Sequence, residues 1–259
     1  MIEQQQIDAF QRDGAVLLKG LLKDWVDVIR VGIEKNMADP GIYAAENTTE
    51  NDKGRFFDDY CNWSRIEEFE QIVRDSPAAR AAAALMQSQR AQFFHDHVLV
   101  KEPGTSKATP WHQDSPYYFV EGSQTVSLWC PVDVVSDATL RCVAGSHRWE
   151  KPVLPVRWLS EESFYPDENA FIPVPDPDDE GMPVLEWGME PGDVVAFHYK
   201  TLHGARENHS STRRRAFSLR FVGDDARYIS RPGKTSPPFP GHNMVDGDRL
   251  RQDWFPVIV

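Results

Sequence analysis

The chain is poor in cysteine, poor in basic residues and free of long apolar runs. Three scattered cysteines, Cys61, Cys130 and Cys142, argue against a disulfide framework and favour a reducing compartment, the cytoplasm. The 28 Lys and Arg residues are outnumbered by 40 Asp and Glu residues. The resulting net charge of −12 argues against nucleic acid and anionic membrane surfaces as partners. No apolar run approaches the length of a membrane span, and the N-terminal "MIEQQQIDAF" lacks the basic start and apolar core of a secretory signal.

What remains is the composition of an ordinary globular protein, with 41% hydrophobic and 26% charged residues. A length of 259 residues suffices for one large domain with a sizeable core, or for two small domains. The sequence shows neither an internal repeat nor a linker-like segment. We therefore expect a single domain over residues 1–259, present as a monomer or a homodimer.

Residues 1–92 are expected to be mainly helical. Apolar residues recur at helical spacing in three stretches, separated by a short apolar run that predicts a strand or buried segment. The helical stretches are 2–14, 23–41 and 76–89, and the apolar run is 15–22. In the third stretch, we expect Ser76 to cap the helix and Pro77 to occupy its first position.

From Phe93 the pattern changes to a period of two, which indicates strands. Strands are predicted within 93–101, 124–135, 192–200 and 214–224. Helices first and strands later, with no strand–helix alternation, predict an α+β or all-β core flanked by helices over residues 93–225. The segment 151–190 is rich in Pro, Asp and Glu and predicts a long loop between strands, and 226–259 predicts an irregular tail.

Three metal-ligating residue types fall near the ends of predicted strands. His112 and Asp114 lie two apart in "WHQD", so an extended backbone directs both side chains to the same side. His203, in "TLHGA", completes the set only if the two strands are neighbours in a barrel or sandwich. Two histidines and one carboxylate leave coordination positions open, as in non-haem Fe(II) oxygenases. By itself a His-x-Asp pair is weak evidence, because a surface strand can carry one without any chemical role.

The strand beginning at Arg214 adds a second signal. Alternation places the residues of this strand on two faces. One face carries Arg214, Ala216, Ser218 and Arg220, and the other carries Arg215, Phe217, Leu219 and Phe221. The first face is polar or small, as expected of a ligand-binding interior, and the second is apolar. An arginine in such an interior needs an anion, and the carboxylate of a dicarboxylate cosubstrate fits the guanidinium fork.

The chain resembles the phytanoyl-CoA dioxygenase family of Fe(II)- and 2-oxoglutarate-dependent oxygenases. The resemblance spans roughly residues 5–225 and rests on four motifs in order: "KEPGTSKATPWHQD", "QTVSLWCPVDVV", "AGSHRW" and "PGDVVAFHYKTLHGARENHSSTRRRAFSLRFVG". It implies a double-stranded β-helix (jelly-roll, cupin-like) core, with N-terminal helices packed on the major sheet.

The resemblance also assigns roles to individual residues. It implies that His112, Asp114 and His203 bind Fe(II). It further implies that Arg214 binds the distal carboxylate of 2-oxoglutarate and that Trp129 lies beside this cosubstrate. The implied reaction uses O2 to hydroxylate an unactivated C–H bond of a small-molecule metabolite, coupled to decarboxylation of 2-oxoglutarate to succinate and CO2.

Two positions depart from the family pattern. Ala205 stands where the family usually has a serine, so one hydroxyl contact to the cosubstrate is missing. Ala138-Thr139 replaces the usual Asn-Gly ahead of the "GSH" loop, which alters a turn rather than the chemistry. The presence of Asp114 argues against the related halogenases, in which a small residue leaves room for chloride.

Other readings remain open. The same ligands could hold zinc in a hydrolase, or the barrel could bind metal and ligand without turnover, although Arg214 weighs against a hydrolase. Candidate substrate-binding residues are Tyr117, Tyr118, Lys101 and His97, each of which could instead serve packing. His147 is expected to tie down a loop, and His198 to be a core residue.

Overall fold

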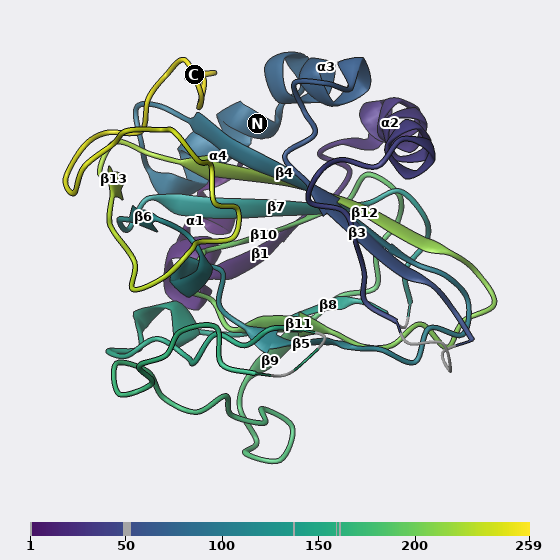
Figure 1. Ribbon diagram of the computed structural model, residues 1–259. Coiled ribbons are helices and arrows are strands. Elements are labelled where there is room, and N and C mark those ends of the chain that lie inside the picture. Colours follow the sequence, from purple (N-terminus) through teal and green to yellow (C-terminus); the bar gives the residue numbers. More distant parts are fainter. Residues whose placement is uncertain (1, 49–52, 137, 159, 161) are drawn as a thin grey trace.

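Two antiparallel β-sheets face each other, and helices cover the outer side of the larger one (Figure 1). The computed structural model describes residues 2–48, 53–136, 138–158, 160 and 162–259. Within these ranges, no helix combines the length and the apolar character that crossing a bilayer would require.

The larger sheet has seven strands in the order β1-β10-β7-β12-β4-β3-β2. Their bounds are Ala15–Leu18 (β1), Ala45–Glu46 (β2), Phe56–Tyr60 (β3), Gln92–Lys101 (β4), Thr125–Pro131 (β7), Val194–Phe197 (β10) and Arg214–Val222 (β12). The smaller sheet has four strands in the order β5-β11-β8-β9. These are Thr109–His112 (β5), Leu140–Val143 (β8), Val184–Glu186 (β9) and His203–Ala205 (β11). A separate short pair joins β6 (Val120–Glu121) to β13 (Arg227–Tyr228).

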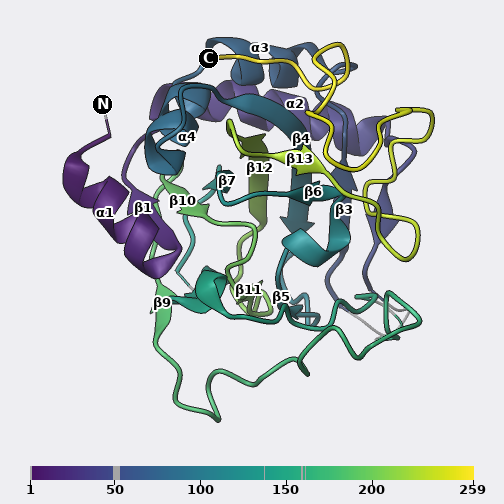
Figure 2. The ribbon, with the colours of Figure 1, turned by 90° about the vertical axis from the view of Figure 1, so that its left-hand side faces the viewer.

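The predicted jelly-roll core with helices on the major sheet is confirmed. The helices are α1 (Gln4–Asp13), α2 (Val26–Ala38), α3 (Glu67–Asp75) and α4 (Ala78–Met86). Figure 2 shows α2, α3 and α4 on the side of the major sheet that faces away from the minor sheet, with α1 at the edge of the sheet beside β1. Phe69 of α3 stacks on Phe217 of β12, with ring centroids 4.4 Å apart. Burial of such residues in one continuous apolar cluster holds the helical layer to the sheet.

Alternation along the central strands gives the sheet two different faces. In β7, Val126, Leu128 and Cys130 belong to the apolar cluster under the helices, whereas Trp129 belongs to a second cluster between the sheets. Along β12, Phe217 likewise packs under the helices and Ala216 packs between the sheets. The assignment of faces from the sequence is therefore confirmed for β12: Arg214, Ser218 and Arg220 share the face of Ala216, towards the interior between the sheets.

The N-terminal part agrees with the expectation in one respect and departs from it in three. The strand or buried run expected within 15–22 is present as β1, an edge strand of the major sheet. β3, "FFDDY", was not anticipated because its two Phe and two Asp do not alternate; four of its five residues are buried. Helix α3 was also missed, and Pro77 takes the N-cap position of α4 rather than its first helical position.

The described residues of 151–190 are irregular, as predicted, except for β9, which was not anticipated. It is tied to the rest of the domain by individual side chains; for example, Arg141 of β8 forms an ion pair with Asp178 at 2.5 Å. The tail 226–259 is also mainly irregular. Its Phe255 is fully buried beside Phe119 and Phe94, so the tail closes one end of the sandwich.

Candidate metal and cosubstrate site

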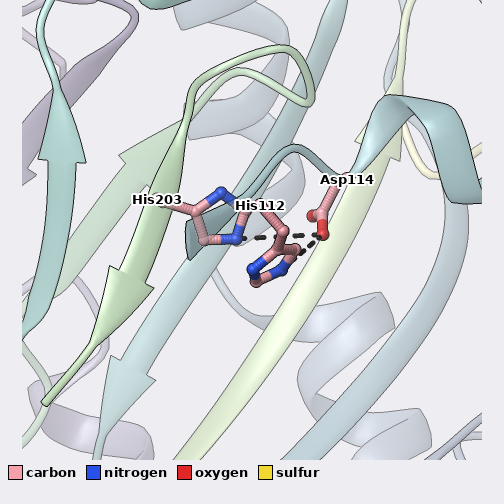
Figure 3. Close-up of side chains that lie close together, drawn as sticks. All are labelled: His112, Asp114 and His203. Carbon is pink, nitrogen blue, oxygen red and sulfur yellow. Dashed lines mark ion pairs between the residues drawn. The ribbon is translucent and has the colours of Figure 1, made fainter. Parts of the chain in front are cut away.

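His112, Asp114 and His203 converge between the sheets (Figure 3). β5 and β11 are neighbouring antiparallel strands, and His112 and His203 are direct partners in the register. Asp114 follows β5 at the start of a short 3-10 turn. Its Oδ1 atom lies 3.7 Å from Nε2 of His112 and 3.8 Å from Nε2 of His203. One ligand atom from each residue lies within 4.8 Å of the others, and all three side chains are buried. The predicted ligand set required the strands of His112 and His203 to be neighbours, and β5 and β11 are neighbours.

Backbone carbonyls orient both imidazoles. Nδ1 of His112 lies 2.8 Å from the carbonyl oxygen of Pro110, and Nδ1 of His203 lies 2.9 Å from that of Thr201. In the neutral tautomers, each Nδ1–H donates to its carbonyl and each Nε2 lone pair faces Asp114. Burial, and to a smaller extent electrostatic repulsion by His112, lowers the pKa of His203 to about 3. This ring is therefore neutral at physiological pH. Neutral imidazoles beside a carboxylate are a donor set suited to a divalent transition metal.

The two oxygens of Asp114 have different environments. Oδ1 faces the histidines, whereas Oδ2 accepts hydrogen bonds from Oγ of Ser127 at 3.0 Å and from Nε of Arg220 at 3.3 Å. Burial alone would favour the neutral acid, but the charge of Arg220 lowers the pKa of Asp114 well below its usual range. Asp114 is therefore ionised. Alternation along β12 predicted that Arg220 faces the interior, but no sequence pattern predicted its pairing with Asp114.

Arg214 is buried in the same interior and has no carboxylate partner among the residues that the structure describes. Its Nη1 donates to the carbonyl of Ala138 at 3.2 Å, and its Cζ lies 5.5 Å from the centre of the Trp129 ring. Nε and Nη2 of Arg214, and Oγ of Ser218, have no hydrogen-bond partner within the part of the chain that the structure describes. Burial lowers the pKa of Arg214 to about 10, which leaves it cationic at neutral pH. A buried guanidinium with free donors is costly unless a ligand supplies an anion.

A small cavity beside Arg214 is lined from both sheets. Its lining includes His112 and His203 as well as Trp129, Ser218 and Arg214. This places the unpartnered donors and the metal-ligand set around one space. Ala205 also lines this cavity. The serine that the family usually has at this position would therefore place its hydroxyl at the cavity, and this chain lacks that group.

Lys101 lies next to Arg214 in the interior between the sheets. It is the cross-strand partner of Arg214. Its Nζ donates to the carbonyl of Arg206 at 3.0 Å and lies 4.6 Å from the centre of the Phe56 ring. Burial and the charge of Arg214 lower the pKa of Lys101 well below its usual range. Its contacts are thus internal to the protein.

The larger cavity has a volume of about 500 Å³ and opens onto the metal-ligand set. Its lining residues are Tyr43, Ala45, Asn47, Asp58, Tyr60, His95, His97, His112, Asp114, Tyr117, Tyr118, Val156, Arg157, Trp158, Ser160, Phe164, Arg220, Ser236 and Pro237. The candidates His97, Tyr117 and Tyr118 are among them. The volume is that of a site for a small organic molecule, and the walls combine Tyr, Trp and Phe rings with charged and polar side chains.

Two features of this cavity were not anticipated from the sequence. Trp158, from the loop 151–190, lies with its ring centroid 5.1 Å from that of His112. Asp58 of β3 accepts a hydrogen bond from His97, whose Nε2 is 2.8 Å from Oδ2. Trp158 lies in an irregular segment and Asp58 in a strand that does not alternate, so neither position carried a periodic signal.

Tyr117 links the metal motif to the loop 151–190. Its hydroxyl lies 2.7 Å from the carbonyl oxygen and 2.9 Å from the amide nitrogen of Val156. It can donate to the first and accept from the second. Both Val156 and Trp158 line the cavity, so this contact helps to fix one of its walls.

The other histidines have structural surroundings. His147 lies near the carbonyl of Gln11, at 3.3 Å, and ties its loop to the end of α1. His198 is buried, and its two ring nitrogens contact the carbonyl of Ser123 and the amide of Lys200. Both agree with the roles expected from the sequence.

Comparisons with known proteins support a family assignment. The family model described as phytanoyl-CoA dioxygenase (PhyH) matches residues 10–216. A probable phytanoyl-CoA dioxygenase of Caenorhabditis elegans is 26% identical over 184 residues, which cover 68% of this chain and 54% of the relative. The peroxisomal phytanoyl-CoA dioxygenase of Rattus norvegicus is 28% identical over 146 residues, covering 54% of this chain and 42% of the relative. The chain spans about half the length of these curated relatives.

Solved structures share the fold over nearly the whole chain. The carbocyclase SnoK from nogalamycin biosynthesis matches with a TM-score of 0.78 and 22% identity, covering 100% of this chain and 97% of that one. The epimerase SnoN, solved with Fe3+, alpha ketoglutarate and nogalamycin RO, matches with a TM-score of 0.78 and 19% identity, covering 99% and 98%. EctD from S. alaskensis, solved with 2-oxoglutarate and 5-hydroxyectoine, matches with a TM-score of 0.69 and 19% identity, covering 96% and 85%.

Proposed function

This chain belongs to the phytanoyl-CoA dioxygenase family, and from that premise we propose that it is an Fe(II)- and 2-oxoglutarate-dependent oxygenase that hydroxylates a C–H bond of a small molecule. The observation that carries the proposal is Arg214. It is a buried cation, two of its nitrogens have no hydrogen-bond partner among the described residues, and it shares a cavity with two of the three candidate metal ligands. Neither metal binding alone nor zinc hydrolysis requires an anion-binding arginine at this position.

The residues have the following proposed roles. His112, Asp114 and His203 hold Fe(II), which together with 2-oxoglutarate and O2 supplies the oxidising power when bound. Arg214 binds the distal carboxylate of 2-oxoglutarate through the donors that the protein leaves free, and Trp129 packs beside it. Ser218, whose hydroxyl also lacks a partner, offers a further hydrogen bond to the cosubstrate.

The larger cavity is the proposed substrate site. Its aromatic rings suit the apolar part of a small molecule, and the charged and polar side chains among them suit polar substituents. His97, Tyr117 and Tyr118 border this substrate. Lys101 is proposed as a residue of the cosubstrate end, because it neighbours Arg214 and does not line this cavity.

We propose hydroxylation as the outcome of the reaction. The structural neighbours named above include a carbocyclase and an epimerase, so the fold accommodates several outcomes. Hydroxylation is favoured over halogenation because Asp114 occupies the carboxylate position of the triad. The three cysteines are free, which agrees with the reducing, cytoplasmic location that we propose.

The direct test is binding of 2-oxoglutarate to the purified protein without oxygen. We expect saturable binding with Fe(II), accompanied by a weak visible charge-transfer band, and formation of succinate once O2 is admitted. Zn(II) and Mn(II) are expected to bind at the same residues without supporting oxidation. A hydrolytic activity sustained by zinc, removed by chelation and not restored by iron, would instead establish the hydrolase.

A further inference from the structure

Asp114 is restrained through one oxygen only. Ser127 of β7 and Arg220 of β12 both donate to Oδ2, while Oδ1 is left facing the two imidazoles. Ser127 and Arg220 are direct cross-strand partners in the major sheet. The Asp114 carboxylate is therefore anchored to two adjacent rigid strands.

Arg220 is itself held in place. It is 5% exposed, its Cζ lies 5.9 Å from the centre of the Tyr118 ring, and its Nη2 is 3.5 Å from Nδ1 of His97. Its Nε is directed at Asp114. A guanidinium confined in this way cannot follow Asp114 if the carboxylate rotates, so rotation would break the bond to Oδ2.

We propose that Arg220 and Ser127 are positioning residues that limit Asp114 to one-oxygen coordination of the metal. The inference rests on the proposed function, because it concerns the metal held by His112, Asp114 and His203. With Oδ2 held by two hydrogen bonds, only Oδ1 is available to a metal at the triad. A carboxylate free to rotate could bind through both oxygens and occupy a position that the cosubstrate requires.

Positioning and charge can be separated by variants that keep one and lose the other. Loss of the Arg220 charge alone acts on metal binding in two opposing ways: it removes the repulsion of a divalent ion, and it removes the charge that keeps the buried Asp114 ionised. Loss of an orienting partner weakens metal binding, typically by about 10- to 100-fold. A variant that keeps the charge but loses the planar donor, and a second variant that removes only the neutral donor Ser127, therefore isolate the positioning role.

The experiment uses Mn(II) as the probe and measures its dissociation constant in the absence of 2-oxoglutarate. We expect Arg220→Met to weaken Mn(II) binding by about 10- to 100-fold and Arg220→Lys to restore part of it, because lysine keeps the charge but not the planar donor. Arg215→Met is the matched control: it lies next to Arg214 on the same strand but faces outward, and it should leave Mn(II) affinity unchanged. Equal or tighter binding by Arg220→Met would overturn the proposal.

Ser127→Ala provides a test free of charge effects. Ser127 lines neither cavity, so it can influence the ligands only through Asp114. We expect this variant to weaken Mn(II) binding by several-fold, on the order of one lost hydrogen bond. At saturating Mn(II) it should also weaken 2-oxoglutarate binding, because Asp114 then competes for a coordination position. Unchanged affinity for both ligands would refute the role of Ser127.

Two controls separate this inference from its premise. If the wild-type protein fails to bind Mn(II) and 2-oxoglutarate, the proposed function itself is wrong. If the wild type binds both and the variants match it, only the positioning role is wrong. Thermal unfolding reports whether Arg220→Met folds; should it not fold, Ser127→Ala and Arg220→Lys give the same decision by the same titrations.

Discussion

Arg214 and Arg215 are adjacent in sequence and opposite in environment. Arg215 faces outward and forms ion pairs with Asp133 at 2.7 Å and with Glu34 at 2.9 Å. Arg214 faces the interior, is 3% exposed and keeps two nitrogens without a partner among the described residues. A shift of one residue in the register of β12 would exchange the two, since alternate side chains point to opposite faces of a sheet.

Exchanging each arginine for methionine should therefore give different phenotypes. Arg214→Met removes the proposed partner of a buried carboxylate, which costs about 3–5 kcal/mol, or roughly two to three and a half decades of 2-oxoglutarate affinity. Arg215→Met should lower the stability of the fold slightly and leave 2-oxoglutarate affinity nearly unchanged, because its ion pairs are partly exposed. Titration of 2-oxoglutarate against both Fe(II)-loaded variants measures the difference. Equal effects would mean that Arg214 does not bind the cosubstrate.

Asp114→Ala should abolish metal binding and succinate formation. It removes the single carboxylate of the ligand set and also leaves the buried Arg220 without its ion partner. We therefore expect a lower unfolding temperature as well as an inactive protein. Asp114→Asn keeps the shape of the side chain and serves as the matched control for volume. Metal content after dialysis against Fe(II), and succinate production, are the measurements; wild-type values for Asp114→Ala would exclude it as a ligand.

His198 makes the fold sensitive to acid. Burial lowers its pKa from 6.5 to about 4, and Nδ1 accepts a hydrogen bond from the amide of Lys200, which a protonated ring could not do. The unfolded chain takes up a proton below pH 6.5 whereas the folded protein does not, so stability falls as the pH drops from 6.5 towards 4. This contribution amounts to about 3 kcal/mol. Chemical unfolding at pH 7 and pH 4.5 should show a smaller loss for His198→Asn than for the wild type; an identical loss would contradict the neutral, buried state.

Tyr117→Phe should loosen the loop 151–190 without removing a metal ligand. The hydroxyl lost is the hydrogen-bond acceptor of the Val156 amide. One such bond contributes about 0.5–1.5 kcal/mol, so exchange of the Val156 amide hydrogen should accelerate by roughly 2- to 12-fold. The amide of Val153, which donates to Gln113 at 2.8 Å, is an internal reference in the same loop. Unchanged exchange at Val156 would show that Tyr117 does not hold this wall of the cavity.

The sequence by itself determined the parts of the protein that depend on periodic burial. Period-two alternation predicted β4, β7, β10 and β12, and it assigned the interior face of β12 before any strand pairing was known. Spacing predicted that His112 and Asp114 act together, although Asp114 follows β5 with a helical backbone conformation and is not part of an extended segment. The resemblance carried by the motifs supplied the family and the expected partners of these residues.

Only the tertiary structure decided the features that depend on contacts between segments distant in sequence. The register that pairs His112 with His203 is one such feature, and the use of β1 and β3 in the major sheet is another. The hydrogen bonds from Arg220 and Ser127 to Asp114 join three segments whose local patterns are independent of one another. Periodicity reports whether a side chain is buried, but not which partner it meets, because the partner is set by strand order and register. For the same reason Trp158, which lies in an irregular loop, could be placed beside His112 only by the folded chain.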